Sequence, residues 1–332
     1  MQECSLIRSR RSVVTAGLAG AALLAAPTIL RAQARVAKVS VLVNEDHPST
    51  ITWNKYAKTV AEKTGGAVQI KVYPNAQLGD EKSVAEGMRI GSIEGSTLNV
   101  AVLSAWVPEG QLFDMPFVFK SLEHGSRVMA GPIGQRMAAK YQPFGFRVLG
   151  YWNNGVRHPL GRFEINTPAD VKGKKMRVIE SPLHIALWSL LGANPTPLPA
   201  PEIYNALQTG VIDFLDNSKS SYLSLRFYEV APYFTDLGHI YSYAAFTFSD
   251  IFWKRLTPVQ QEILRTEAAQ AIIDQDRLAA AADETALAKT VTMGTKVTRP
   301  DHAPWEAAMK PFWEKFAANV GGMGAIQEIL AA

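Results

Sequence analysis

The amino-acid sequence predicts an α/β fold of two lobes, with mixed, largely parallel sheets and a long helix bracing them. Strand-like and helix-like segments alternate from residue 36 to about 152, as in α/β proteins. The alternation restarts at about residue 175, which predicts a second lobe. Residues 258–291 are almost continuously helical, and at about 1.5 Å per residue this helix would be about 50 Å long. We expect a ligand in the cleft between the lobes.

In the first run, β-branched segments precede amphipathic ones. Residues 36–43 (VAKVSVLV) and 67–73 (AVQIKVY) alternate in the way that predicts strands. Residues 50–63 carry apolar side chains at helical spacing and end before two glycines. The remaining expected elements are a helix at 81–90, a strand at 96–102, helices at 121–129 and 133–141, and a strand at 144–152.

In the second run, we expect a strand at 175–179 and another at 211–215 that leads directly into Asp216 and Asn217. Helices are expected between them, at 183–191 and 201–208, and a last amphipathic helix at 304–319.

Residues 1–34 have the composition of an export signal. Basic residues including Arg10 and Arg11 precede an apolar stretch at 13–30, and Ala32 and Ala34 form an A-x-A site. The stretch is too short and weakly apolar for a stable membrane span, although an uncleaved anchor remains the alternative. The adjacent arginines favour twin-arginine export, with Sec as the other route. We therefore expect a periplasmic protein, cleaved after Ala34.

Cleavage would change the charge balance. The whole chain has 34 Lys+Arg against 30 Asp+Glu, and the signal carries four arginines against Glu3, which leaves 30 against 29. A nearly neutral chain without interleaved basic and aromatic clusters argues against a nucleic-acid partner. The only cysteine, Cys4, would also be removed. The mature chain would need neither disulfides nor a redox partner.

Motifs of catalysis do not occur. The sequence has no G-x-S-x-G elbow, no P-loop and no H-E-x-x-H. The six histidines are scattered, without a pair at metal-ligand spacing. We therefore predict a protein that is not an enzyme and that has no metal site and no cofactor.

Five segments together resemble the solute-binding proteins of TRAP transporters, the DctP-type family. They are 73–81 (YPNAQLGDE), 114–119 (DMPFVF), 154–157 (NGVR), 170–178 (DVKGKKMRV) and 202–217 (EIYNALQTGVIDFLDN).

This resemblance covers about residues 36–320 and implies a periplasmic-binding-protein architecture, with two lobes joined by crossing strands and a long helix. The lobes would close over an organic acid and hand it to an ion-driven permease of small and large membrane subunits. We expect a monomer, with lobe I at 35–153 plus about 243–281, and lobe II at 154–242 plus about 282–328.

Arg177 is the first candidate site residue. It lies in a short apolar strand, where an inward-facing charge would need an anionic partner. A guanidinium fork matches a carboxylate in two charge-assisted hydrogen bonds, and the resemblance implies that Arg177 clamps the ligand carboxylate. The alternative is an alternating strand with Lys175 and Arg177 facing outward.

Arg157 and Asn217 are the next candidates. Arg157 follows a glycine, and the resemblance implies a second ligand contact; a hinge or salt-bridge arginine is the alternative. Asn217 follows a strand end, and its amide can donate to a carboxylate and accept from a hydroxyl. This chain has Asp-Phe-Leu-Asp-Asn at 213–217, where the family has Asp-Gly-Gln-Glu-Asn. The departure puts the family's usual substrate in doubt.

Four further residues are weaker candidates. Asn99 is a polar ligand contact or an ordinary turn residue, and Glu81 accepts sugar hydroxyls or caps the helix that it begins. His47 lies in a ligand-facing loop or is solvated, and Trp152 stacks on the ligand or belongs to the core. Ala200 stands where some sialate-binding relatives have a pocket aromatic, which disfavours sialic acid.

The function predicted is the capture of a monocarboxylate, with a uronic or aldonic acid as a candidate. Arg177 would clamp its carboxylate, while Arg157 and Asn217 would complete the polar shell. The alternatives are a binding protein of an ATP-driven importer and a secreted hydrolase or lyase.

Overall fold

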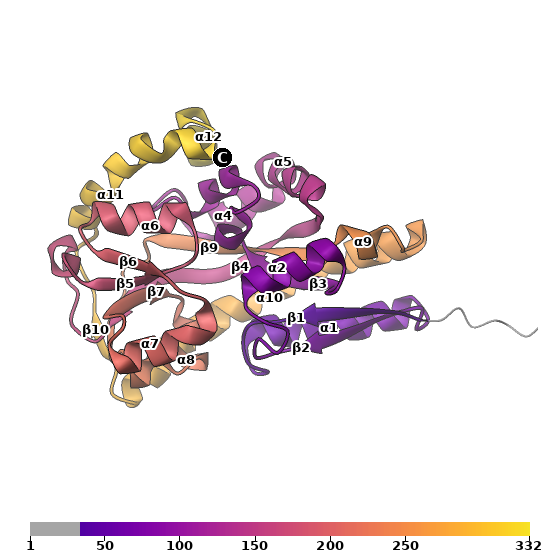
Figure 1. Cartoon of the computed structure of the whole chain (residues 1–332), viewed down its shortest axis with the longest axis horizontal. Helices are drawn as coiled ribbons and strands as arrows, with labels where there is room; N and C mark the ends of the chain where they lie inside the picture. Colours follow the sequence, from indigo (N-terminus) through magenta and orange to yellow (C-terminus); the bar gives the residue numbers. More distant parts are fainter. Residues whose placement is uncertain (1–33) are drawn as a thin grey trace, which may run out of the picture. The chain divides into compact units, whose positions relative to one another are not determined.

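The computed structural model describes residues 34–332 (Figure 1). The predicted export signal lies almost wholly outside the described residues. Residues 35–332 form one compact unit, and its strands belong to a single connected sheet.

The strands form two parallel sets joined by antiparallel strands. In one set β1 pairs in parallel with β2 and β3, and in the other β5 pairs in parallel with β6 and β7. Antiparallel β9 and β4 connect the sets, and β8 pairs with both β4 and β10. The predicted mixed α/β architecture is confirmed. The strands are β1 (Arg35–Ser40), β2 (Val68–Tyr73), β3 (Gly95–Asn99), β4 (Phe146–Gly161), β5 (Lys175–Val178), β6 (Asn194–Pro197), β7 (Phe214–Asn217), β8 (Tyr233–Thr235), β9 (Ile240–Ser249) and β10 (Lys296–Thr298).

Strand β4 belongs to both sets. Its residues from Phe146 to Arg157 pair with β9, and its last residues, from His158, pair with β7. The register with β9 shifts between Asn153 and Val156. The strand predicted at 144–152 therefore continues nine residues further, and β9 was not predicted at all.

The eight helices predicted from the sequence are present close to their expected bounds, whereas the short helices Val100–Leu103, Lys219–Ser224, Asp250–Trp253 and Met323–Ala331 were not predicted. The expected helix at 201–208 is a 3-10 turn, Ala200–Glu202, followed by α7, and the one at 304–319 ends as α11 before a 3-10 turn at Ala317–Val320. The helices are α1 (Pro48–Lys63), α2 (Glu81–Ile90), α3 (Val100–Leu103), α4 (Leu122–Ala130), α5 (Pro132–Tyr141), α6 (Pro182–Leu190), α7 (Ile203–Thr209), α8 (Lys219–Ser224), α9 (Asp250–Trp253), α10 (Pro258–Thr292), α11 (His302–Phe316) and α12 (Met323–Ala331).

The long helix is α10, with 35 residues. Thr257 begins it with a capping box, accepting from the Gln260 amide nitrogen while the Gln260 side chain accepts from the Thr257 nitrogen. The helix packs against α1 beside the first strand set, against β4, and against α8 beside the second. It therefore spans both sets, as predicted.

The C-terminal helices pack back onto early parts of the chain. Trp305 of α11 donates its indole N–H to the Asn166 carbonyl oxygen, and Trp313 donates to that of Pro116. A ring nitrogen of His124 on α4 lies 2.9 Å from the Ile329 carbonyl oxygen of α12. The largest hydrophobic cluster accordingly combines residues between 84 and 151 with residues between 305 and 329.

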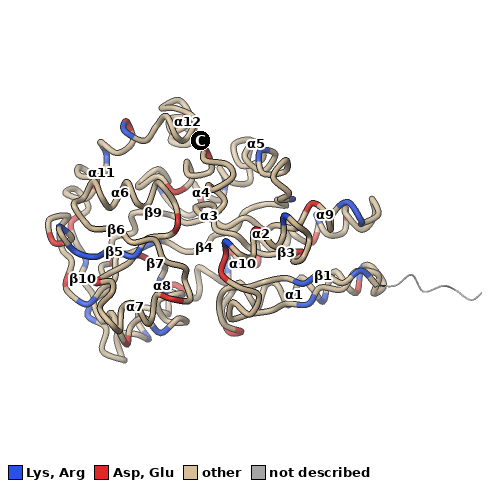
Figure 2. Tube along the Cα trace, viewed as in Figure 1, with Lys and Arg blue, Asp and Glu red and all other residues tan. Residues whose placement is uncertain are grey.

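Basic and acidic residues are interspersed along the described chain (Figure 2). This fits the near balance of charges counted from residue 35 onward. Within residues 34–332, no helix is both long enough and apolar enough to cross a membrane.

Candidate functional site

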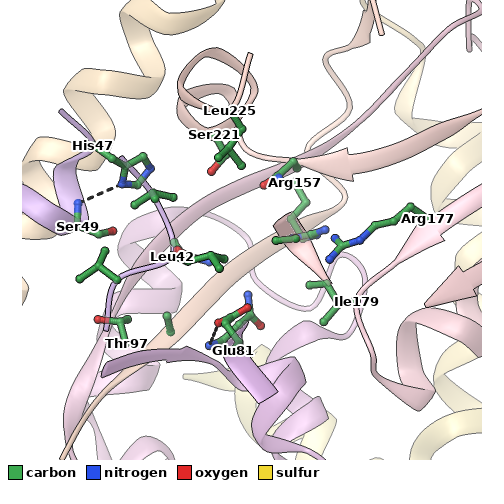
Figure 3. A pocket seen from close by; sticks show the side chains of 17 residues that line it. Leu42, His47, Ser49, Glu81, Thr97, Arg157, Arg177, Ile179, Ser221 and Leu225 are labelled. Atoms are coloured by element: carbon green, nitrogen blue, oxygen red, sulfur yellow. Dashed lines mark hydrogen bonds between the residues drawn. The ribbon is translucent and has the colours of Figure 1, made fainter. Parts of the chain in front are cut away.

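A cavity of about 80 Å³ lies where the two strand sets meet. Six of the seven predicted site residues line it: His47, Glu81, Asn99, Arg157, Arg177 and Asn217. Figure 3 shows the Arg157 and Arg177 side chains close together on one side, with Glu81 below them and His47 with Ser49 on the other side.

Arg177 lies in β5 and is 5% exposed. Its neighbours Met176 and Val178 are also buried, so the predicted alternative of an outward-facing Arg177 is wrong. Its Nε donates to the Leu198 carbonyl oxygen at 2.9 Å, and its two Nη nitrogens have no acceptor among the described residues. Burial, followed by the charge of Arg157, lowers the pKa of Arg177 to about 10, which leaves it a cation at neutral pH.

Arg157, in β4, is neutralised by a buried carboxylate. Its Nε and Nη2 donate to the two Asp216 carboxylate oxygens at 3.1 and 2.5 Å, and Nη2 also donates to the Asp216 carbonyl oxygen at 2.6 Å. Burial alone would lower the pKa of Arg157, but the charge and hydrogen bonds of Asp216 outweigh burial and raise it. The Nη1 of Arg157 has no acceptor within residues 34–332.

Asp216 is fully buried and also accepts a hydrogen bond from His239 Nε2 at 3.0 Å. Burial raises the pKa of Asp216, yet Arg157 and His239 together hold it well below its usual range. Burial lowers the pKa of His239, so this histidine is a neutral donor. Arg157 therefore forms the salt bridge that the sequence analysis gave as its alternative role, and it also lines the cavity.

Asn217 ends β7, and its side-chain oxygen accepts from the Ser218 nitrogen at 2.9 Å. Its Nδ2 is a donor with no acceptor among the described residues. Together with the free nitrogens of Arg177 and Arg157, it gives the cavity a set of converging donors. Such donors suit an anion with several acceptor oxygens.

Glu81 provides an acceptor opposite these donors. One carboxylate oxygen accepts from the Asn99 nitrogen at 2.9 Å, and the other has no partner in the described part of the chain. Burial raises the pKa of Glu81, against the lowering effects of Asn99, Arg177 and Arg157. The N-cap of α2 is Asp80, whose side chain accepts from Ser83, so the prediction that Glu81 caps this helix is wrong.

Asn99 has both ends of its amide engaged. Its oxygen accepts from the Ala101 nitrogen at 2.9 Å, and its Nδ2 donates to the Ser242 hydroxyl at 3.1 Å. It ends β3 and caps α3, so the expected strand at 96–102 stops here because the chain turns into a helix. Although Asn99 lines the cavity, its side chain has a structural role.

His47 and Trp152 differ from their predicted environments. His47 is buried and caps α1, with Nδ1 accepting from the Ser49 nitrogen at 3.2 Å, so the solvated alternative is wrong. Trp152 is fully buried among Trp53 and Phe246, and it is absent from the cavity lining. We therefore drop Trp152 as a ligand contact.

Several lining residues were not predicted. Asn154 belongs to the motif that contains Arg157, and Ser221 of α8 lies four residues after Asn217, so proximity in sequence was an available signal. Ala200 also lines the cavity, where it leaves the space of a larger side chain open. The other lining residues are Val41, Leu42, Val43, Ser49, Thr97, Ile179, Leu225 and Ala244.

The cavity combines buried cations that have free donors with a carboxylate acceptor. Within residues 34–332, no group of three or more His, Cys, Asp or Glu could hold a metal ion.

Comparison with known proteins gives consistent matches. The family described as "Bacterial extracellular solute-binding protein, family 7" (DctP) matches residues 39–319. A solute-binding protein of Chromohalobacter salexigens is 32% identical over 277 residues, which cover 81% of this chain and 81% of that protein.

Two solved structures are similar over nearly the whole described chain. A TRAP periplasmic solute binding protein from Bradyrhizobium sp., in complex with galacturonate, has a TM-score of 0.87 and 30% identity, covering 90% of this chain and 100% of that chain. The sugar acid binding protein of Advenella mimigardefordensis, in complex with galactonate, has a TM-score of 0.87 and 26% identity, covering 90% of this chain and 97% of that one.

Proposed function

Because the chain belongs to the family 7 bacterial extracellular solute-binding proteins, the DctP-type receptors of TRAP transporters, we propose that it captures a hydroxylated monocarboxylate of five or six carbons. This family consists of solute receptors rather than enzymes, which argues against the hydrolase or lyase alternative. The family also separates the chain from binding proteins of ATP-driven importers.

The observation that carries this proposal is the unpaired charge of Arg177. It is buried, no carboxylate of residues 34–332 lies within salt-bridge distance, and both Nη nitrogens are free. A buried charge without a partner costs several kcal/mol, so a carboxylate bound in the cavity would relieve that cost through two charge-assisted hydrogen bonds. Arg157 Nη1 and Asn217 Nδ2 would donate to the same ligand.

Charge balance favours one carboxylate over two. Asp216 neutralises Arg157, so Arg177 can match one ligand charge, whereas a second ligand carboxylate would face Glu81. The free Glu81 oxygen instead suits a hydroxyl donor. The ligand of this proposal therefore has a carboxylate at one end and hydroxyl groups at the other.

Cavity size supports a sugar acid. The cavity has a volume of about 80 Å³. Since one water molecule needs about 10–15 Å³ of such space and takes up about 30 Å³ of liquid, the cavity holds about five to eight waters, or about 150–240 Å³ of liquid. That is the volume of a five- or six-carbon sugar acid. The acids bound by the two solved relatives, galacturonate and galactonate, fall in this class.

The proposal includes the transport context. The lobes would be residues 35–153 with about 243–281, and 154–242 with about 282–328, and they would close by bending near the irregular register of β4. After export directed by residues 1–34, the loaded monomer would deliver the acid to the small and large permease subunits in the membrane.

The test is calorimetric titration of D-galacturonate, D-glucuronate and galactonate into the wild type and Arg177→Ala. We expect Arg177→Ala to weaken binding at least about a hundredfold, because two charge-assisted hydrogen bonds are lost. Thermal stability without ligand should change little, because removal of an uncompensated buried charge offsets the lost hydrogen bond to the Leu198 carbonyl oxygen. Lys175→Ala, an exposed cation on the same strand, is the matched control and should bind like the wild type. Unchanged affinity in Arg177→Ala would refute the carboxylate clamp.

A further inference from the structure

Beside the ligand cavity lies a second cavity of about 420 Å³, bounded by the loop after β1, helix α8 and helix α10. His47 lines both cavities, whereas Asn44 and Ser224 line only the second. The loop follows a strand of the first set, and α8 follows β7 of the second. This second cavity therefore lies at a junction between the two strand sets.

Three buried polar atoms at this junction have no hydrogen-bond partner within the described chain: Asn44 Oδ1, His47 Nε2 and Ser224 Oγ. Their residues are neighbours. Asn44 Nδ2 donates to the Ser224 carbonyl oxygen at a long 3.3 Å, and the Asn44 carbonyl oxygen accepts from the His47 nitrogen. An unsatisfied buried polar atom costs about 1–3 kcal/mol, so three of them together mark an interface whose hydrogen bonds are incomplete.

The three atoms are complementary in kind. His47 Nδ1 accepts from the Ser49 nitrogen, so the neutral ring carries its proton on Nε2, which is a donor. Asn44 Oδ1 is an acceptor, and the Ser224 hydroxyl can accept and donate at once. His47 Nε2–H can donate to Ser224 Oγ, and the Ser224 hydroxyl can donate to Asn44 Oδ1. These two hydrogen bonds would satisfy all three atoms once α8 and the loop came together.

We propose that Ser224, His47 and Asn44 form an interlobe latch that closes when the acid binds and thereby sets the affinity of the site. This inference rests on the proposed function, because it needs a ligand whose binding brings the lobes together. His47 connects the two events, since it lines the ligand cavity and carries the first donor of the latch. Ser224 and Asn44 are positioning residues that do not line the ligand cavity.

The test compares Ser224→Ala with the wild type by calorimetry, with D-galacturonate, D-glucuronate, galactonate and succinate as probes. Loss of the shared hydroxyl should weaken binding about 3- to 30-fold, because two hydrogen bonds of the bound state are lost. Thermal stability without ligand should stay the same or rise, because the hydroxyl has no partner in that state. Ser224→Thr, which keeps a hydroxyl, should restore most of the affinity.

Two controls separate a latch from a merely structural role. Thr285→Ala removes a hydroxyl of the same cavity that already donates within its own helix, so it should leave affinity unchanged. Asn44→Ala combined with Ser224→Ala should lose less affinity than the two single changes added together, because both act on one chain of hydrogen bonds.

Closure itself can be measured. Residues 35–332 contain no cysteine. Lys71→Cys in β2 and Glu202→Cys in the 3-10 turn before α7 therefore provide unique sites for spin labels, one on each side of the cavity. Binding of the ligand should narrow the distribution of distances between the two spin labels when Ser224 is present. In Ser224→Ala the ligand should narrow this distribution less.

The outcomes are distinct. A wild type that binds none of the four acids would overturn the proposed function and the latch with it. A wild type that binds succinate alone would overturn the proposed ligand class, and the latch would then be judged with succinate. If the wild type binds, two results would overturn the latch alone. One is that Ser224→Ala binds as tightly as the wild type, and the other is that Ser224→Ala loses as much thermal stability without ligand as with it.

Discussion

The buried pair of Arg157 and Asp216 gives the sharpest prediction for stability. The guanidinium is 4% exposed and the carboxylate is fully buried, and three hydrogen bonds join the two residues. Asp216→Asn keeps the shape of the side chain but removes the charge that neutralises Arg157. Breaking one partner of such a pair costs about 3–5 kcal/mol, because a buried charge is left uncompensated. We expect a loss of that size in the free energy of unfolding.

The assay is urea unfolding at pH 7, followed by circular dichroism. A carboxyl whose pKa is depressed by folding contributes stability above its unfolded pKa and loses it as the pH falls through its folded pKa. The pKa of Asp216 is held low, so its contribution is complete at pH 7. Arg136→Ala, which breaks the exposed pair with Glu328, is the control and should change stability by less than about 1 kcal/mol.

A double-mutant cycle tests the cause. Arg157→Met removes the cation, so the double variant with Asp216→Asn has no uncompensated buried charge. It should lose about 3 kcal/mol less than the sum of the single losses. Additive losses, or a loss below about 1 kcal/mol in Asp216→Asn, would refute the reasoning.

Two further predictions concern the residues around the site. In urea unfolding, Gly155→Ala should lower the free energy of unfolding by at least about 2 kcal/mol more than Gly173→Ala. Both glycines have positive φ, but only the new Cβ of residue 155 would meet a side chain, at 2.2 Å from Ser218 Cβ. Equal losses in the two variants would contradict the packing argument. Burial lowers the pKa of His47 from 6.5 to about 4, so the unfolded chain binds more protons between these values and stability falls as the pH drops through this window. Between pH 7 and pH 4, the free energy of unfolding of the wild type should fall by about 3 kcal/mol more than that of His47→Asn. Parallel profiles of unfolding free energy against pH would show that burial of His47 has no such effect.

The sequence predicted the elements with local signals and missed those defined by distant partners. The helical spacing of apolar residues placed eight helices close to their observed bounds. The pattern in β9 is hidden because nearly every residue of the strand is buried, so neither face is polar and no alternation appears. Residues 100–103, VAVL, resemble a strand, but they form a short helix that Asn99 caps.

The residues of the candidate site also divide into those that local motifs marked and those that only distant contacts bring together. Arg177, Arg157 and Asn217 were found from motifs, and all three line the cavity. The Asp216–His239 hydrogen bond joins residues 23 apart in sequence, and nothing local marks their contact. The alternation of Lys175 to Val178 suggested an outward Arg177, but β5 lies between β6 and β7 and its last three residues are all buried.

The packing of the 3-10 turn Ala317–Val320 against η1 (Pro108–Asp114), and the contact of α12 with α4, have a consequence for the order of folding. One hydrophobic cluster needs residues near 84 and residues near 329 at the same time, so it cannot form on a chain that is still incomplete. Contacts this distant in sequence form late, after loop closure has been overcome. A ribosome-bound chain therefore lacks the last part of its core until the residues near 329 have been synthesised.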